Sequence, residues 1–217
     1  MGRDVKIIDI SLMLQGGLVT YPKDVPFARR IQRDQEEGDS STVSVLETSA
    51  HAGTHIDAPR HFFSEMAGVD GIPLEYLYGP CFVADCRGSA AVTREQLEAA
   101  VPAGVKRLLL KTDNSAALAA DPTGPFNKEF VYVDRSAAEF CLERGMVLVG
   151  IDYLSIDQSG NAEKPAHNLL LPRHVVILEG IVLDGVEAGE YFLACGALNI
   201  KDADGSPARV VLLDGWG

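Results

Sequence analysis

The sequence predicts an α/β fold with a mixed β-sheet or barrel-like β core flanked by helices. The chain has 217 residues, of which 47% are hydrophobic and 23% charged, as is ordinary for one globular domain. About eight segments have the β-branched or alternating pattern of strands, against two or three helical segments. Several strands follow one another without an intervening helix, which argues against a doubly wound parallel sheet.

The N-terminal half is predicted to be mostly strands with one helix. Residues 4–12 and 42–50 are rich in β-branched residues and partly alternate, as strands do. Residues 73–86 and the apolar run 105–113 are the other predicted strands. Residues 93–102, TREQLEAAVP, form a predicted amphipathic helix. Thr93 is its candidate N-cap and Pro102 stops it.

The C-terminal half begins with a second predicted helix, RSAAEFCLERG, which ends at Gly145. Residues 147–157 are predicted to be a strand that runs into a loop. The remaining predicted strands span 174–185, 190–198 and 208–215. Because the chain has no repeat, low-complexity tract or Ser/Gly linker, we expect a single domain over 1–217.

The charge of the chain restricts its partners. A formal net charge of −12 opposes binding to nucleic acid or to an anionic membrane, since both require a basic surface. No apolar run reaches the roughly 20 residues of a membrane span, and the N-terminus lacks a signal-peptide pattern. We therefore expect a cytoplasmic protein with a small-molecule partner.

The cysteines do not indicate a zinc knuckle or a disulfide. They form no CxxC pair and stand at Cys81, Cys86, Cys141 and Cys195. The first two are five residues apart in a predicted strand, so they point to opposite faces. We expect all of them to be buried thiols.

Three of the five histidines lie between residues 51 and 63, in the pattern His51-x3-His55-x-Asp57-x3-His61. Glycine, β-branched residues and proline argue against a helix here, so an extended segment is expected, in which His55 and Asp57 point the same way. Gly53 lets the backbone bend His51 toward them. Two imidazoles and a carboxylate suit Zn²⁺, Mn²⁺ or Fe²⁺. A surface turn with solvated histidines is the alternative, and spacing alone favours neither.

A second stretch, residues 165–185, favours the metal. Glu179 lies among apolar residues, where a lone carboxylate is costly unless it is paired or coordinated. An ion pair with Arg173 or a position at a strand end is the alternative. If Glu179 and His167 fold onto the first cluster, the ligands suffice for one or two metals. His61 is better placed as a general acid or base, and His174 is expected to be structural or exposed.

Three segments resemble the metal-dependent cyclase family, which includes the bacterial kynurenine formamidases. HAGTHIDAPRHF resembles the family signature HxGTHxDxPxH, and VLVGIDYLSID resembles its GxDxxSxD segment. Residues 166–193 resemble its second metal segment. The resemblance extends from the first strand nearly to the C-terminus.

The resemblance implies a swivelling β/β/α fold, a homodimer or homotetramer, and one or two divalent metals. Zn²⁺ is the first expectation and Mn²⁺ the alternative. His61 matches the catalytic proton donor and acceptor of the family. Asp57 and Glu179 match its bridging carboxylates, and His167 a ligand of the second metal. The full implied ligand set is His51, His55, Asp57, His167 and Glu179.

The implied activity is that of a metal-dependent amidohydrolase, which cleaves an aryl formamide such as N-formylkynurenine with a metal-activated water. Kynurenine formamidases carry a Trp-Pro pair where this chain has Tyr21-Pro22. Tyr21, Phe62 and Phe63 are the expected substrate wall, since aromatic rings stack on an aryl substrate.

Two other functions stay open, a hydrolase of isatin or another cyclic amide and a non-catalytic, metal-containing binder of small molecules. The roles of Ser155 and Asp157 are open as well. Asp157 either orients a liganding histidine or caps a loop.

Overall fold

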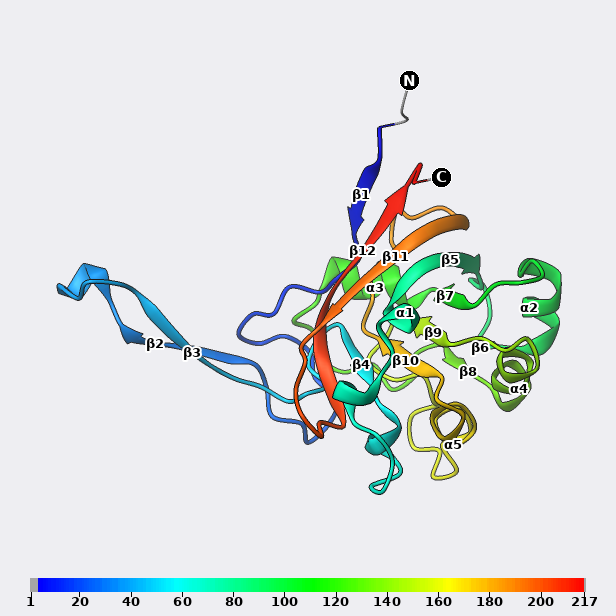
Figure 1. The fold of residues 1–217 in the computed structure, drawn as a ribbon, viewed down its shortest axis with the longest axis horizontal. Coiled ribbons are helices and arrows are strands. Elements are labelled where there is room, and N and C mark those ends of the chain that lie inside the picture. Colours follow the sequence, from blue (N-terminus) through cyan, green and yellow to red (C-terminus); the bar gives the residue numbers. More distant parts are fainter. Residues whose placement is uncertain (1–3, 217) are drawn as a thin grey trace.

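The core of the protein is a sheet that closes on itself. A computed structural model describes residues 4–216. The eight strands of the main sheet run in the spatial order β1 (Lys6–Asp9), β12 (Gly205–Asp214), β11 (Gly189–Ala197), β5 (Tyr78–Asp85), β7 (Arg107–Lys111), β9 (Leu148–Ile151), β10 (Val176–Glu179) and β4 (His55–Asp57). Because β4 also pairs with β12, every strand of this main sheet except β1 belongs to a closed ring (Figure 1). This confirms the predicted barrel-like core.

The sheet is mixed, as the sequence predicts. β5, β7, β9 and β10 are parallel neighbours, and the other pairs are antiparallel. The alternation of side chains produces two cores. Leu108 and Leu110 of β7 pack toward the helices, whereas Leu109 belongs to the cluster on the other face, with Ile56 and Leu178. All of them are fully buried.

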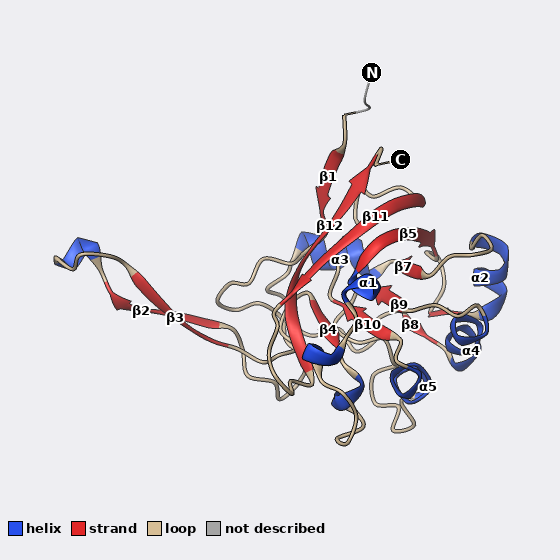
Figure 2. Cartoon of the chain, in the orientation of Figure 1, coloured by secondary structure: helices blue, strands red, loops and turns tan. Residues whose placement is uncertain are grey.

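Three helices cover one side of the sheet: α2 (Arg94–Ala100), α4 (Arg135–Glu143) and α5 (Pro165–Leu170) (Figure 2). Thr93 caps α2 in a full capping box with Gln96, as expected. Gly145 follows α4 with a φ of 63°, the left-handed conformation that favours glycine after a helix. Both predicted helices are therefore confirmed.

Some elements were not predicted. These are the short helices α1 (Leu74–Leu77), α3 (Asn114–Ala120) and α5, the 3₁₀ turns at Gln35–Glu37, Pro59–His61, Val69–Gly71 and Leu171–Arg173, and the strands β2 (Ala28–Arg33), β6 (Ala91–Val92) and β8 (Tyr132–Val133). The predicted strand at 42–50 exists as β3 (Val43–Glu47), but it pairs with β2 outside the main sheet. This hairpin projects from the body of the molecule (Figure 1).

The cysteines are free and buried, as predicted. Cys81 and Cys86 belong to the two different core clusters, which confirms that they face opposite sides of the sheet. Within residues 4–216, no helix has the length and apolar character needed to cross a membrane.

Candidate metal centre

The ring brings together the two stretches that the sequence singled out. His55 and Asp57 are the ends of β4, and Glu179 is the last residue of β10. These two strands are antiparallel neighbours, with Glu179 directly opposite His55. His167 comes from α5, which packs against β10. All four side chains are at most 5% exposed, so the solvated-turn alternative does not hold for them.

A close backbone crossing fixes the start of β4. Gly180 has a φ of 68°, and a Cβ atom there would lie 2.2 Å from the carbonyl oxygen of Gly53. Glycine is therefore required at this position. The hydroxyl of Thr54 donates to the Gly180 carbonyl over 2.6 Å and accepts from the Leu12 amide over 2.8 Å. The Gly53–Gly180 contact and the Thr54 hydrogen bond thus hold the start of β4 against the end of β10.

His55 directs its Nε2 atom into the site. Its Nδ1 lies 2.9 Å from the Gly53 carbonyl oxygen, which can only accept, so Nδ1 carries the proton. Its Nε2 is buried without a hydrogen-bond partner. That atom lies 3.3 Å from Glu179 Oε2 and 3.6 Å from Asp57 Oδ1.

His167 is held in the same manner by Asp157. Its Nδ1 lies 2.6 Å from Asp157 Oδ2, and its Nε2 lies 3.4 Å from Asp57 Oδ2 and 3.6 Å from Glu179 Oε1. The Asp157 carboxylate also accepts the amides of Ala166 and His167 at the start of α5. Asp157 therefore has both of the roles that the sequence left open: it orients a histidine and ends a loop.

This donor set fits a divalent cation. Asp57 Oδ2, like His55 Nε2, is a buried polar atom without a hydrogen-bond partner. Two imidazole nitrogens and two carboxylates converge, and such mixed nitrogen and oxygen ligands suit Zn²⁺ or Mn²⁺. Ligand atoms of His51, His55 and Asp57 lie within 4.8 Å of one another, as do those of Asp57, His61 and His167. The two groups share Asp57, the expected bridging carboxylate.

His51 is engaged at both nitrogens. Nδ1 lies 2.8 Å from Asp57 Oδ1, and Nε2 lies 2.8 Å from Asp204 Oδ2. Burial lowers the pKa of His51, but the two carboxylates outweigh it and raise the pKa to about 10. Asp57 has a pKa well below its ordinary value, because its contacts with the histidines outweigh its burial. No sequence pattern pointed to Asp204, which lies in a loop far along the chain.

His61 is the most exposed histidine of this cluster, with 29% of its side chain accessible. It lies at the end of the 3₁₀ turn Pro59–His61. The centroid of its ring is 4.1 Å from that of the His51 ring, and its Nδ1 is 3.7 Å from Asp204 Oδ2. Burial lowers its pKa. His174, by contrast, is exposed and outside the cluster, as predicted.

A cavity of about 400 Å³ opens beside these residues. Tyr21 and Phe62 line it, and Phe62 stacks on His167 with 4.5 Å between ring centroids. Phe63 is not among its lining residues and packs instead against the core under the helices. Ser155 and Lys164 also line the cavity, and the sequence did not single out Lys164.

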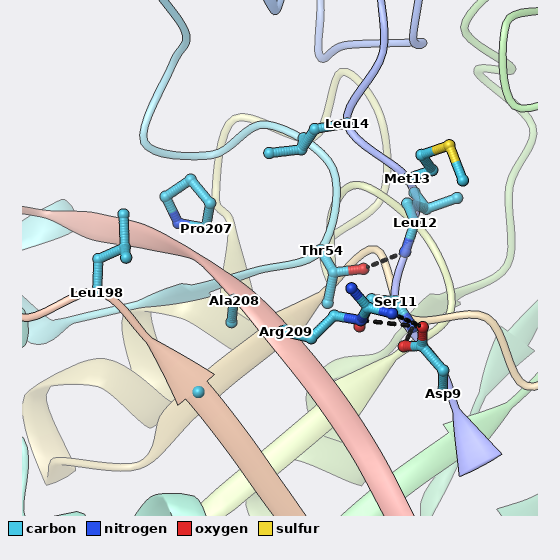
Figure 3. Close-up of a pocket in the computed structure, with 11 residues that line it drawn as sticks. Asp9, Ser11, Leu12, Met13, Leu14, Thr54, Leu198, Pro207, Ala208 and Arg209 are labelled. Atoms are coloured by element: carbon cyan, nitrogen blue, oxygen red, sulfur yellow. Dashed lines mark hydrogen bonds and ion pairs between the residues drawn. The ribbon is translucent and has the colours of Figure 1, made fainter. Parts of the chain in front are cut away.

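A second cavity, of about 440 Å³, lies between β12 and the segment after β1 (Figure 3). Its only charged lining residues, Asp9 and Arg209, pair with each other. No histidine or cysteine lines it. Of these two cavities, only the one beside the histidines gathers side chains that can hold a metal or transfer a proton.

Comparison with known proteins identifies the family of the chain. Residues 8–158 match the family profile named Cyclase. The kynurenine formamidase of Bacillus thuringiensis (strain Al Hakam) is 36% identical over 205 residues, which are 94% of this chain and 96% of the relative.

Solved structures share the fold as well. A structure described as a potential metal-dependent hydrolase with cyclase activity superposes with a TM-score of 0.82 at 30% identity, covering 97% of this chain and 98% of the other. Isatin hydrolase A from Labrenzia aggregata, bound to benzyl benzoate, has a TM-score of 0.83 at 26% identity, with 96% and 93% covered.

Proposed function

Since the chain belongs to the Cyclase family, we propose that it is a metal-dependent hydrolase that cleaves the formamide bond of an aryl formamide such as N-formylkynurenine. One observation carries the proposal. The Nε2 atoms of His55 and His167 both face Asp57 and Glu179, while each Nδ1 is committed to an acceptor. A buried arrangement of this kind is costly without a cation between the four groups.

The proposed ligands are His51, His55, Asp57, His167 and Glu179, with Zn²⁺ as the first expectation and Mn²⁺ as the alternative, in one or two sites. When bound, a divalent metal polarises the amide carbonyl and lowers the pKa of water. His51 must release its contact with Asp57 or with Asp204 to coordinate, because both of its nitrogens are engaged. Elemental analysis of the purified protein identifies the metal and the number of ions per chain.

The residues of the chain supply the other parts of the reaction. His61 reaches the cavity and takes the proton from the attacking water, then returns it to the leaving nitrogen. Asp204 lies beside His61 Nδ1, which leaves Nε2 for this exchange. Tyr21 and Phe62 offer flat apolar surfaces to the aryl ring of the substrate.

The test separates metal binding from proton transfer. We expect His61→Ala to keep its metal but lose roughly 100-fold to 10,000-fold in kcat, because it removes only the general acid and base. Asp57→Ala should lose the metal first. The measurements are metal content and hydrolysis of N-formylkynurenine by protein loaded with Zn²⁺ or Mn²⁺, with a chelated sample as control. If His61→Ala contains no metal, His61 is not only the general acid and base. If metal-loaded wild type does not hydrolyse N-formylkynurenine, the proposed substrate is wrong.

Hydrolysis of a cyclic amide such as isatin is the second candidate. The similarity to isatin hydrolase A favours it, as does Tyr21-Pro22 at the position where kynurenine formamidases carry Trp-Pro. Attack of water on a ring carbonyl would use the same metal ligands and the same proton transfer by His61 as attack on a formyl group. Parallel assays with isatin and N-formylkynurenine decide between the two substrates.

We also propose that the protein forms a homodimer or homotetramer. The β2–β3 hairpin supports this, because it projects from the body and exposes Ile31 and Leu46. An isolated two-stranded ribbon is at best marginally stable in water. Light scattering gives the number of chains, and a monomer at micromolar concentration contradicts the proposal.

A further inference from the structure

Lys164 has an unfavourable backbone conformation beside the candidate site. Its φ and ψ are 43° and 58°, the left-handed region that an L-residue other than glycine rarely adopts. The next residue is Pro165, and a residue before proline is normally extended. Strain of this kind persists where surrounding structure imposes it, and it is concentrated at functional sites. Here it places a lysine in the lining of the cavity.

The ammonium group of Lys164 meets Tyr21. Nζ donates to the Tyr21 hydroxyl oxygen over 3.4 Å and lies 5.7 Å from the centre of its ring. The Tyr21 ring is held from another side by an edge contact with Phe126, with 5.2 Å between centroids. Because the phenol oxygen accepts from lysine, its own O–H is left to donate to another group.

The pair therefore offers several donors and one positive charge. Within residues 4–216, no carboxylate lies within 4.0 Å of Lys164 Nζ, and the Tyr21 hydroxyl donates to no protein acceptor. Such a set of N–H and O–H donors complements the two oxygens of a carboxylate.

The charges around the cavity permit an anion at this place. Lys23 also lines the cavity and also has a positive φ, of 83°. Asp24 is the acidic lining residue on this segment, and its carboxylate accepts from the Ser49 hydroxyl over 3.5 Å. Glu179 is the other acidic lining residue, so the two lysines balance two carboxylates at this cavity. In a chain of net charge −12, such a lining is locally less acidic than the rest of the protein and does not repel an anionic ligand.

We propose that Lys164 and Tyr21 form a carboxylate-binding subsite, which makes the preferred substrates amides that carry a carboxylate away from the reacting bond. This rests on the proposed hydrolase function. In this arrangement the reacting amide lies at the histidines and the carboxylate is anchored at the ammonium and phenol groups. Lys164 and Tyr21 then set specificity and take no part in the proton transfers.

The experiment compares N-formylkynurenine with its methyl ester, which keeps the aryl formamide and the ammonium group but lacks the carboxylate charge. For Lys164→Gln we expect KM for the acid to rise roughly tenfold or more, with kcat within about twofold, because a charge-assisted contact to the substrate is lost. KM for the ester should not change. Lys164→Arg should keep most of the preference for the acid. Lys128→Gln, which removes the same charge from an exposed position outside the cavity, is the matched control.

Binding of the product separates the two proposals, because it needs no turnover. Calorimetry should show that kynurenine binds wild type more tightly than kynurenine methyl ester does, and that Lys164→Gln removes the difference. Equal effects of Lys164→Gln on acid and ester, or no acid preference in wild type, overturn the subsite while leaving the hydrolase intact. Absence of turnover with either formamide, together with acid-selective binding, overturns the proposed formamidase activity and keeps the subsite.

Discussion

Asp157 shows how one residue outside the ligand set controls the site. It is fully buried, and it accepts two backbone amides of α5 as well as Nδ1–H of His167. The backbone contacts fix where the helix begins, and the imidazole contact fixes which nitrogen faces Asp57. A carboxylate behind a liganding histidine sets its tautomer and raises its basicity. Helix position and ligand orientation are thus set by the same side chain.

We expect Asp157→Asn to lower metal affinity by roughly 10-fold to 100-fold, because the amide loses the charge and one acceptor that hold His167. Competition with a chelator of known affinity measures the change. Asp134→Asn is the matched control, since Asp134 accepts the Ala137 amide at the start of α4 and contacts no histidine. If both variants bind metal like wild type, Asp157 acts only as a helix cap.

Among the elements, the crossing of the turn before β4 and the end of β10 matters most for the site. The Gly53 carbonyl that touches Gly180 is also the acceptor for His55 Nδ1. The turn therefore cannot move away from Gly180 without losing the orientation of His55. The pairing register of β4 and β10 therefore also determines the direction of His55 Nε2.

Gly180→Ala should destabilise the protein by more than about 2 kcal/mol, since it adds left-handed strain to a backbone clash, and should also weaken metal binding. Gly160→Ala is the control, because Gly160 has a similar φ of 75° but open space around its Cβ position. It should cost only about 1–2 kcal/mol and leave metal affinity unchanged. Urea unfolding and chelator competition measure both effects. Equal losses in the two variants would mean that the contact with Gly53 is unimportant.

The elements also show what could be predicted from the sequence. The glycine, β-branched residues and proline of residues 51–63 predicted an extended segment, and Glu179 among apolar residues predicted a paired or coordinated carboxylate, because both signals are local. Asp204 and Lys164 were missed, since each lies in a loop and reaches the cluster only through tertiary structure. The α5 helix was missed because its six residues are too few to show a helical period. Phe63 was assigned to the substrate by its neighbourhood, but the side chain of Phe62 alone faces the cavity.

In the whole molecule, the site depends on closure of the sheet. β4 is only three residues long, yet it joins β10 to β12 and so completes the ring. Its two ends are His55 and Asp57. Residues 57 and 179 meet only when strands far apart in the chain are paired, so an unfolded or opened chain does not present the donor set. Metal binding is therefore coupled to the closed fold.

This coupling predicts that metal removal lowers the melting temperature. A ligand that binds only the folded state at 100 times its Kd adds about 2.7 kcal/mol, which for a chain of this size corresponds to roughly 5–11 °C. Removal leaves His55 Nε2 and Asp57 Oδ2 buried without partners, which is the physical source of the loss. Thermal melts of wild type with Zn²⁺ or Mn²⁺ and after chelation measure the shift, and Asp57→Asn should show none. A shift of equal size in Asp57→Asn would mean that the stabilising metal binds elsewhere. An unchanged melting temperature of wild type at saturating metal would mean that the site forms without closure of the ring.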